Sequence, residues 1–153
     1  MTSKNFSSRI LLQNLRRALS EKKGAQGRLD RIVKLIASAM KAEVCSIYLI
    51  REDNLLELYA TEGLLPAAVH LSKLRIGQGL VGKIAKNAEP IKSSNVTKAK
   101  GFRYLPETGE EIFKSFLGVP IQRLGNILGV LVIQNTSKRD YKEDDVYGLE
   151  IVA

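Results

Sequence analysis

The stretch SFLGVPIQRLGNILGVLVIQNT, residues 115–136, decides the fold class of this 153-residue chain. Two apolar runs, 115–124 and 127–136, flank the pair Gly125-Asn126. A Gly-Asn pair between two such runs indicates a β-hairpin. The second run is apolar at nearly every position, which is typical of a strand covered on both faces. The sequence therefore predicts two paired antiparallel strands, one of them central.

A second hairpin is predicted nearer the N-terminus. Residues 44–51 (VCSIYLIR) are rich in β-branched and aromatic side chains, and 55–61 (LLELYAT) return after a turn at Asp53-Asn54. Shorter extended pieces are expected at 71–76 and 89–96. Two separate hairpins favour an antiparallel arrangement. We expect an α/β protein of the α+β type, with a central antiparallel sheet of five to six strands.

Three helices are predicted. Two rest on apolar residues that recur at three- and four-residue steps, and the last rests on acidic residues in its first turn. They span residues 6–22, 28–41 and 141–153. Because they come from the two ends of the chain, we expect these terminal helices to cover one face of the sheet. The segment 71–113, with a short helix at 77–87, is expected to cover the other face as a lid over a small-molecule pocket.

The domain organisation follows from these elements. Residues 1–27 are expected to form an N-terminal helix and linker, and residues 28–153 a single folded domain. No glycine cap or proline closes the last predicted helix, so we expect that helix to be truncated and the chain to be part of a longer protein.

Composition excludes several classes of protein. The single cysteine, Cys45, allows no internal disulfide and no zinc site built from cysteines, and it favours a reducing cytoplasm. No apolar run is long enough to span a membrane. The net charge of +8 permits attraction to nucleic acid, but the basic residues are dispersed and form no binding stripe. We expect neither membrane nor nucleic acid as a partner.

The string Gly77-Gln78-Gly79-Leu80-Val81-Gly82 matches the G-x-G-x-x-G pattern of dinucleotide-binding proteins. That fingerprint belongs to a parallel βαβ unit with an acid about 20 residues further on. The hairpins here are antiparallel, and residues 96–104 contain no acid. We therefore interpret the glycines as a tight turn and a close contact between helix and sheet.

Two residues are candidates for chemistry. His70, the only histidine, could accept a phosphoryl group, act as a general base or be structural. Cys45 could carry a cofactor or a redox role, or be a small buried hydrophobe. Nothing in the sequence supplies a nucleophile, a base and an oxyanion site together. We expect no catalytic residue, metal or cofactor in this chain.

The connection from Thr97 to Phe113 is long, and loops of that length in compact domains are usually functional. Arg103 and Glu110 carry opposite charges, as recognition of a zwitterion such as an amino acid requires. Acid–base work by the glutamates or a solvated helix face are the alternatives. Phe102 and Phe113 are expected to supply apolar walls, and Tyr104 a polar contact.

Polar residues also lie at the ends of the two strands predicted at 115–124 and 127–136. Ser115 begins one, and Gln134 and Asn135 end the other. They either mark where the strands reach solvent or lie at the rim of a pocket over the sheet. The candidate ligand-binding residues are therefore Phe102, Arg103, Tyr104, Glu110, Phe113, Ser115 and Gln134.

Three segments in order resemble the GAF family. They are LRIGQGLVGKIAKNAEPIK (74–92), SFLGVPIQRLGNILGVLVIQN (115–135) and YKEDDVYGLE (141–150). Each piece is weak alone, but the ordered set is fairly specific and the resemblance runs from about Leu29 to the end of the chain. It implies the GAF fold and a regulatory role in sensing a small molecule.

Further segments are similar to the N-terminal GAF modules of nitrogen-related phosphoenolpyruvate–protein phosphotransferases, enzyme I of the nitrogen phosphotransferase system. They are AEVCSIYLIR (42–51), LELYATEGL (56–64) and PETGEEIFKSFLGVPI (106–121). This resemblance implies a cytoplasmic module that binds glutamine and controls catalytic domains elsewhere in the full-length protein. The Gly-Gly-x-x-Ser-His motif of the family's phosphohistidine is absent, so His70 inherits no catalytic role.

A second hypothesis needs no ligand. The apolar stripe of residues 6–22 and the final helix 141–153 could pair across a two-fold axis. The chain would then be a homodimeric docking module of a larger signalling protein.

Overall fold

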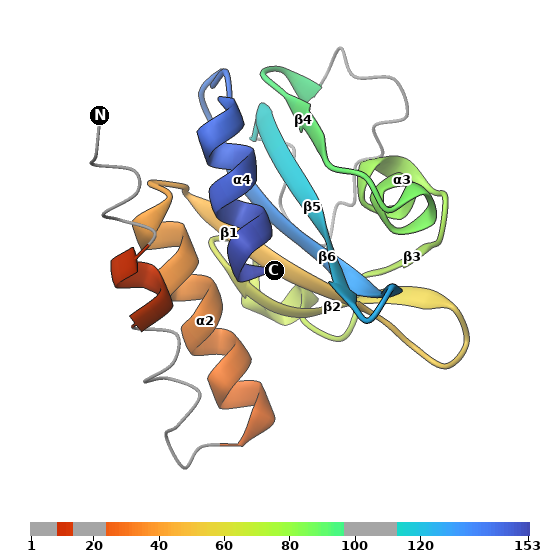
Figure 1. Ribbon diagram of the computed structural model, residues 1–153. Helices are drawn as coiled ribbons and strands as arrows, with labels where there is room; N and C mark the ends of the chain where they lie inside the picture. The colour runs from red at the N-terminus through yellow and green to blue at the C-terminus, as the bar shows by residue number, and fades with distance from the viewer. Residues whose placement is uncertain (1–8, 14–23, 97–112) are drawn as a thin grey trace.

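A six-stranded antiparallel sheet forms the centre of the molecule (Figure 1). The computed structural model describes residues 9–13, 24–96 and 113–153. The strands are β1 (Val44–Ile50), β2 (Leu55–Glu62), β3 (Lys73–Arg75), β4 (Ile91–Ser93), β5 (Ser115–Arg123) and β6 (Asn126–Asn135). They lie in the order β3-β2-β1-β6-β5-β4, and every neighbouring pair is antiparallel. The predicted sheet is confirmed, with its two most apolar strands, β1 and β6, at the centre.

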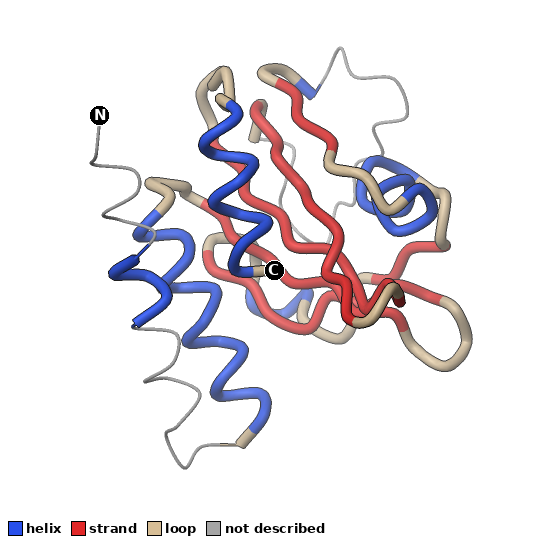
Figure 2. The backbone as a smooth tube through the Cα atoms, in the orientation of Figure 1, coloured by secondary structure: helices blue, strands red, loops and turns tan. Residues whose placement is uncertain are grey.

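Helices cover both faces of this sheet (Figure 2). The helices α2 (Ala25–Ala39) and α4 (Glu143–Val152) and a helical segment at residues 9–13 pack on one face, which we call the terminal-helix face. The helix α3 (Gly79–Asn87) and the short 3-10 helix η1 (Pro66–Ala68) pack on the other, the α3 face. For the described residues the predicted division between the two faces is confirmed, whereas η1 was not predicted. Residues 6–8 and 14–22 of the first predicted helix and residues 97–112 of the predicted lid lie outside the described residues.

Strand alternation sorts the core into two apolar layers. In β6, Val130 and Val132 belong to the layer beneath α3, whereas Leu131 and Ile133 belong to the layer beneath α2 and α4. Successive side chains of a strand point to opposite faces, so an apolar residue at every position serves both layers. This burial explains why β6 lacks the polar alternation of a surface strand.

The turn between β5 and β6 corrects one prediction. The sequence pattern places the turn at Gly125-Asn126, but the structure places it at Leu124-Gly125 and pairs Asn126 with Arg123. Both turn residues have left-handed backbones, with φ of 53° at Leu124 and 80° at Gly125. Positive φ at both central positions is what a type I′ hairpin turn requires, and the 94% exposed Leu124 accepts that conformation beside Gly125.

The helix boundaries also move by two or three residues. The helix α2 begins at Ala25, with Gly24 as its N-cap, rather than at residue 28. The helix α4 begins at Glu143 rather than at residue 141, because the Asp145 carboxylate accepts a hydrogen bond from the Lys142 main-chain N–H and closes the N-terminus there. Tyr141 consequently lies in the connection before α4.

Candidate functional site

The glycine motif before α3 serves the backbone. Gly77 and Gly79 have φ of 92° and 67°, which glycine adopts without strain. The Gly77 N–H donates to the Gly82 carbonyl at 2.8 Å, and a Cβ on Gly82 would lie 2.6 Å from the Arg75 carbonyl oxygen. The motif closes a tight turn against β3. This geometry agrees with the structural interpretation of the motif rather than with dinucleotide binding.

Four of the seven predicted ligand-binding residues lie outside the described part of the chain. They are Phe102, Arg103, Tyr104 and Glu110. The other three, Phe113, Ser115 and Gln134, are all buried.

Phe113 and Gln134 belong to the α3 face. Phe113 is 6% exposed and packs in the apolar layer beneath α3. Gln134 pairs across the sheet with Val44 on one side and Phe116 on the other, and both partners belong to that same layer. Because cross-strand partners share a face, the Gln134 amide enters the α3 layer.

Gln134 is only 2% exposed, so its amide is a polar group placed within apolar surroundings. Ser46, another buried polar residue of this face, is 2.9 Å from the Thr61 hydroxyl. Burying an amide is costly unless it is hydrogen-bonded. No fully buried side-chain nitrogen or oxygen of the described residues lacks a hydrogen-bond partner, so Gln134 places a buried polar group, and not a vacant one, in this layer.

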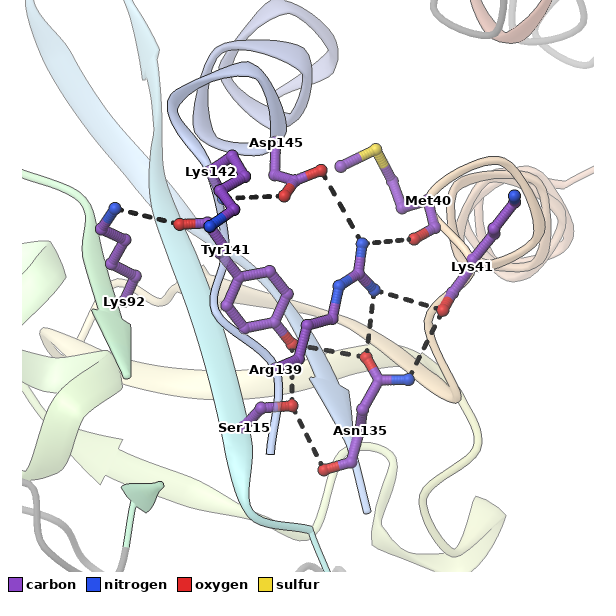
Figure 3. Close-up of polar contacts among 9 residues, drawn as sticks. All are labelled: Met40, Lys41, Lys92, Ser115, Asn135, Arg139, Tyr141, Lys142 and Asp145. Atoms are coloured by element: carbon purple, nitrogen blue, oxygen red, sulfur yellow. Dashed lines mark hydrogen bonds and ion pairs between the residues drawn. The ribbon is translucent and has the colours of Figure 1, made fainter. Parts of the chain in front are cut away.

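Ser115 points the other way. It pairs with Asn135, the residue after Gln134, and its side chain therefore lies on the terminal-helix face. Its hydroxyl donates to the Asn135 main-chain carbonyl at 3.4 Å and is 3.1 Å from the Tyr141 hydroxyl (Figure 3). The structure thus separates Ser115 from Phe113 and Gln134 by the thickness of the sheet.

Asn135 is the centre of a polar cluster at this end of the terminal-helix face (Figure 3). Its side-chain oxygen accepts from the Tyr141 hydroxyl at 3.3 Å, and its side-chain nitrogen donates to the Lys41 carbonyl at 3.4 Å. Tyr141 is almost fully buried, and burial raises the pKa of its phenol above the ordinary value, although the hydrogen bond with Ser115 opposes this shift. The phenol therefore acts here as a neutral hydrogen-bonding group.

Arg139 joins this cluster to the end of α2. Its guanidinium donates to the carbonyls of Met40 at 3.0 Å and Lys41 at 3.2 Å. The last turn of α2 has no basic residue of its own. A cation is favourable at a helix C-terminus, so Arg139 supplies from the β6–α4 connection the charge that α2 lacks.

The same guanidinium reaches the start of α4. It lies 3.7 Å from the carboxylate of Asp145, which caps α4 through the Lys142 N–H, and it stacks 4.8 Å above the Tyr141 ring. Lys92 of β4 adds a hydrogen bond of 3.0 Å to the Tyr141 carbonyl. One arginine thus contacts the residues that end α2 and the first turn of α4.

Glu43 fastens the α2–β1 connection to the end of β6. Its carboxylate accepts hydrogen bonds from the main-chain N–H of Thr136 at 2.8 Å and from the Thr136 hydroxyl at 2.9 Å. The Thr136 main-chain N–H has the largest effect and lowers the pKa of Glu43 below its ordinary value. Burial opposes it, and the Thr136 hydroxyl and the Asn135 amide add to the lowering. Glu43 therefore accepts these hydrogen bonds as an ionised carboxylate.

A second polar cluster lies at the other end of α2. His70 Nδ1 is 2.6 Å from Glu57 Oε2, and His70 Nε2 is 2.9 Å from Gln26 Oε1. Arg51 donates to Glu57 at 2.9 Å. The hydrogen bond with His70 and the charge of Arg51 hold the pKa of Glu57 below its ordinary value, while burial opposes them. Both ring nitrogens of His70 are engaged, which agrees with the structural hypothesis for this residue.

An open hollow of about 470 Å³ adjoins this cluster at the β1–β2 hairpin. Its lining includes Arg51 and Asp53, which form an ion pair of 3.6 Å, and Tyr59, whose ring meets that of His70 edge-on at 4.8 Å. Two of the three charged residues that line the hollow, Arg51 and Asp53, are thus already paired with each other.

Cys45 is buried beneath α2, and burial raises the pKa of its thiol above the usual range. A reactive thiolate needs a lowered pKa, so the site opposes redox or covalent chemistry. Within residues 9–13, 24–96 and 113–153, no group of three or more His, Cys, Asp and Glu side chains is placed to hold a metal ion. None of the helices in these ranges is long and apolar enough to cross a membrane.

Comparison with known proteins places this geometry in a family. The model of the GAF domain family matches residues 25–153. The chain is 37% identical over 134 residues to a protein of Escherichia coli K12 named for the phosphoenolpyruvate-dependent phosphotransferase system. It is 32% identical over 117 residues to the Nif-specific regulatory protein of Azospirillum brasilense. These alignments cover 84% and 73% of this chain but only 18% of each relative.

Solved structures agree with the sequence comparison. The GAF domain of the Acinetobacter phosphoenolpyruvate-protein phosphotransferase superposes with a TM-score of 0.84 at 32% identity, covering 97% of this chain and 87% of that one. The corresponding GAF domain from Coxiella burnetii gives a TM-score of 0.87 at 27% identity, with 99% and 88% covered. The resemblance predicted from the sequence is confirmed, and the chain belongs to the GAF domain family.

Proposed function

We propose that this chain is the sensing module of a phosphoenolpyruvate-dependent phosphotransferase in nitrogen signalling and that its ligand is glutamine. The 37% identity to the Escherichia coli protein and the likeness to two phosphotransferase GAF domains support the first part. The chain spans 18% of the length of that relative. In our proposal the catalytic domains lie elsewhere in the full-length cytoplasmic protein, and this module regulates them.

The buried amide of Gln134 is the observation that carries the ligand proposal. A glutamine side chain offers one amide donor and one amide acceptor group, which an amide within an apolar layer can match. Phe113, in the same layer, would form part of the apolar wall. Ser115 lies on the opposite face, so in the proposal it links the sheet to Tyr141 rather than sharing the pocket.

The remaining recognition groups come from the segment 97–112. We propose that Arg103 binds the α-carboxylate of glutamine and Glu110 its ammonium group, through charge-assisted hydrogen bonds. Phe102 and Tyr104 would complete the contacts. Reversing the charge of Arg103 should abolish binding, and an unchanged affinity would exclude that role.

A thermal unfolding experiment tests the proposal. We expect glutamine, but not glutamate or 2-oxoglutarate, to raise the melting temperature of the chain. At about 100 times its dissociation constant, a ligand adds roughly 2.7 kcal/mol of stability, which corresponds to several degrees for a domain of this size. No shift with glutamine at millimolar concentration would contradict the proposal.

A pair of variants assigns the effect to the α3 face. Gln134→Leu keeps a similar volume but removes the buried amide, so it should abolish the glutamine shift while the domain stays folded. Gln122→Leu is the matched control, because Gln122 is exposed near the tip of the β5–β6 hairpin. Loss of the shift in both variants would show that the amide of Gln134 has no specific part in binding.

A homodimeric docking module is the second candidate, and one observation favours it. Tyr147 and Ile151 lie one turn apart on α4, and they are 65% and 41% exposed, while Leu149 of the same helix is buried. An apolar pair on the outer side of a helix suits an interface between two copies. Light scattering should give a dimer for the wild type and a monomer for Tyr147→Glu, whereas a monomeric wild type would exclude this candidate.

A further inference from the structure

The two described ends that border residues 97–112 are tied to the last residue of β6. The Val96 main-chain N–H donates to the Lys114 carbonyl at 2.6 Å, and the Lys114 N–H donates to the Asn135 carbonyl at 2.9 Å. We call Val96, Lys114 and Ser115 the loop base. The loop base is thus held by the main chain of Asn135.

The side chain of Asn135 is committed to different partners. Its oxygen accepts from Tyr141 and from Arg139, both at 3.3 Å, and its nitrogen donates to Lys41 and to Glu43, both at 3.4 Å. A side-chain amide offers four hydrogen-bonding positions, and all four are used here. Asn135 therefore cannot shift without breaking contacts on both the loop-base side and the helix side.

Arg139 extends these contacts to both terminal helices. It binds the carbonyls of Met40 and Lys41 at the end of α2 and lies beside Asp145 in the first turn of α4 (Figure 3). These contacts share donors and acceptors in a partly buried cluster, so the loss of one leaves polar groups unsatisfied and weakens the others.

We infer that Asn135, Arg139 and Tyr141 form a coupling node that transmits changes at the loop base to the end of α2 and the start of α4. The node lies on the face opposite Gln134 and Phe113, so it is separate from the proposed ligand contacts. The claim that glutamine acts through this node rests on the proposed function. The claim that the node couples the loop base to the helices does not, because it can be tested without a ligand.

Hydrogen exchange without ligand tests the coupling directly. In Arg139→Ala we expect the amides of Val96 and Lys114, and those in the first turn of α4, to exchange about tenfold faster or more, as the loss of hydrogen bonds from a charged group predicts. Lys138→Ala, at the exposed neighbouring residue, removes the same charge outside the node and should leave these amides unchanged.

The central strands distinguish coupling from a general loss of stability. The amides of Leu131 and Val132 in β6 should be much less affected than those of Val96 and Lys114. Faster exchange in α4 with no change at Val96 and Lys114 would overturn the node, and so would an equal acceleration throughout the sheet.

Tyr141→Phe is a milder variant that keeps the ring in its core position. It removes only the hydroxyl that lies between Ser115 and Asn135. We expect the same amides to exchange faster in this variant, by a smaller factor than in Arg139→Ala. No change at the loop base in Tyr141→Phe would remove Tyr141 from the node.

Adding glutamine separates the node from the proposed function. If both hold, glutamine slows exchange in the first turn of α4 in the wild type, whereas Arg139→Ala still binds glutamine but shows no such slowing. Slowing of α4 in Arg139→Ala equal to that in the wild type would overturn the node. If the wild type does not bind glutamine, the proposed function is contradicted. The hydrogen exchange of Arg139→Ala without ligand then supports or overturns the node by itself.

Discussion

The two faces of the sheet differ in how they use polar groups. On the α3 face, the buried amide of Gln134 lies in an apolar layer with Phe113 and Phe116. On the terminal-helix face, the polar groups around Asn135 bond to one another and to both helices. The α3 face thus places the amide of Gln134 among apolar neighbours. The terminal-helix face uses polar groups to join the end of β6 to α2 and α4.

This difference assigns separate tasks to the faces. A small-molecule pocket is largely apolar and has a few placed polar groups, as the α3 face has. A connection between elements needs directional contacts that are made or lost together, as the terminal-helix face has. A ligand on one face would then change the helices on the other only through the strands and their ends.

The largest expected effect comes from truncating one core isoleucine on each face. Ile84 of α3 and Ile133 of β6 are both fully buried. We expect Ile84→Ala and Ile133→Ala each to lower the free energy of unfolding by about 3 kcal/mol, measured by urea denaturation. Calorimetry should show weaker glutamine binding only for Ile84→Ala. Equal losses of affinity in both variants would contradict the separation of tasks.

Removing Arg139 should have the next largest effect. Because its guanidinium bonds to the two carbonyls that directly follow α2 and to Asn135, we expect Arg139→Ala to cost about 2 kcal/mol of stability in urea denaturation. Lys138→Ala should change stability by less than about 0.5 kcal/mol. A loss in Arg139→Ala as small as that of the control would show that the contacts around Asn135 are weak.

A smaller effect is expected at the opposite end of α2. His70 has a left-handed backbone, with φ of 66°, and bonds to Glu57 and Gln26. His70→Asn keeps the left-handed preference but shortens the side chain, so we expect a loss of about 1 kcal/mol in thermal or urea unfolding. Exchange should rise in the first turn of α2 and stay unchanged at Lys114. Faster exchange at Lys114 would show that the two polar clusters act as one.

The smallest predicted effect depends on pH. Hydrogen bonds from Thr136 lower the pKa of Glu43 in the folded state, so its stabilisation is present above the ordinary glutamate pKa of 4.5 and is lost as the pH falls through the folded value. Because Glu43 is exposed, we expect this contribution to be under about 1 kcal/mol. Below pH 4.5 the stability of Glu43→Gln should fall less steeply than that of the wild type. Parallel curves would exclude the contribution.

Much of the fold could be predicted from the sequence because its signals are local. The apolar runs of β1 and β6 identified the central strands, and the apolar periodicity of α2 identified a helix. The error at Leu124-Gly125 arose because the backbone twist of the strands selects the turn residues, and a leucine gives little sign of a left-handed backbone.

The candidate site was less predictable, although one rule was available. Gln134 and Asn135 are neighbours in a strand, so they must point to opposite faces, and Ser115 must share the face of its partner Asn135. Strand alternation could therefore have separated Ser115 from Gln134. Arg139 gave no such signal, because its partners Met40 and Lys41 are about a hundred residues away and only the folded sheet brings them together.

The most direct test of the separation of tasks is a titration of the isotope-labelled chain with glutamine, followed by amide chemical shifts. We predict early, large changes at Gln134, Phe113 and α3, with smaller changes at Asn135, Tyr141 and the first turn of α4, and with the smaller changes absent in Arg139→Ala. Shifts confined to the exposed side of α4, or no shifts at saturating glutamine, would contradict the account.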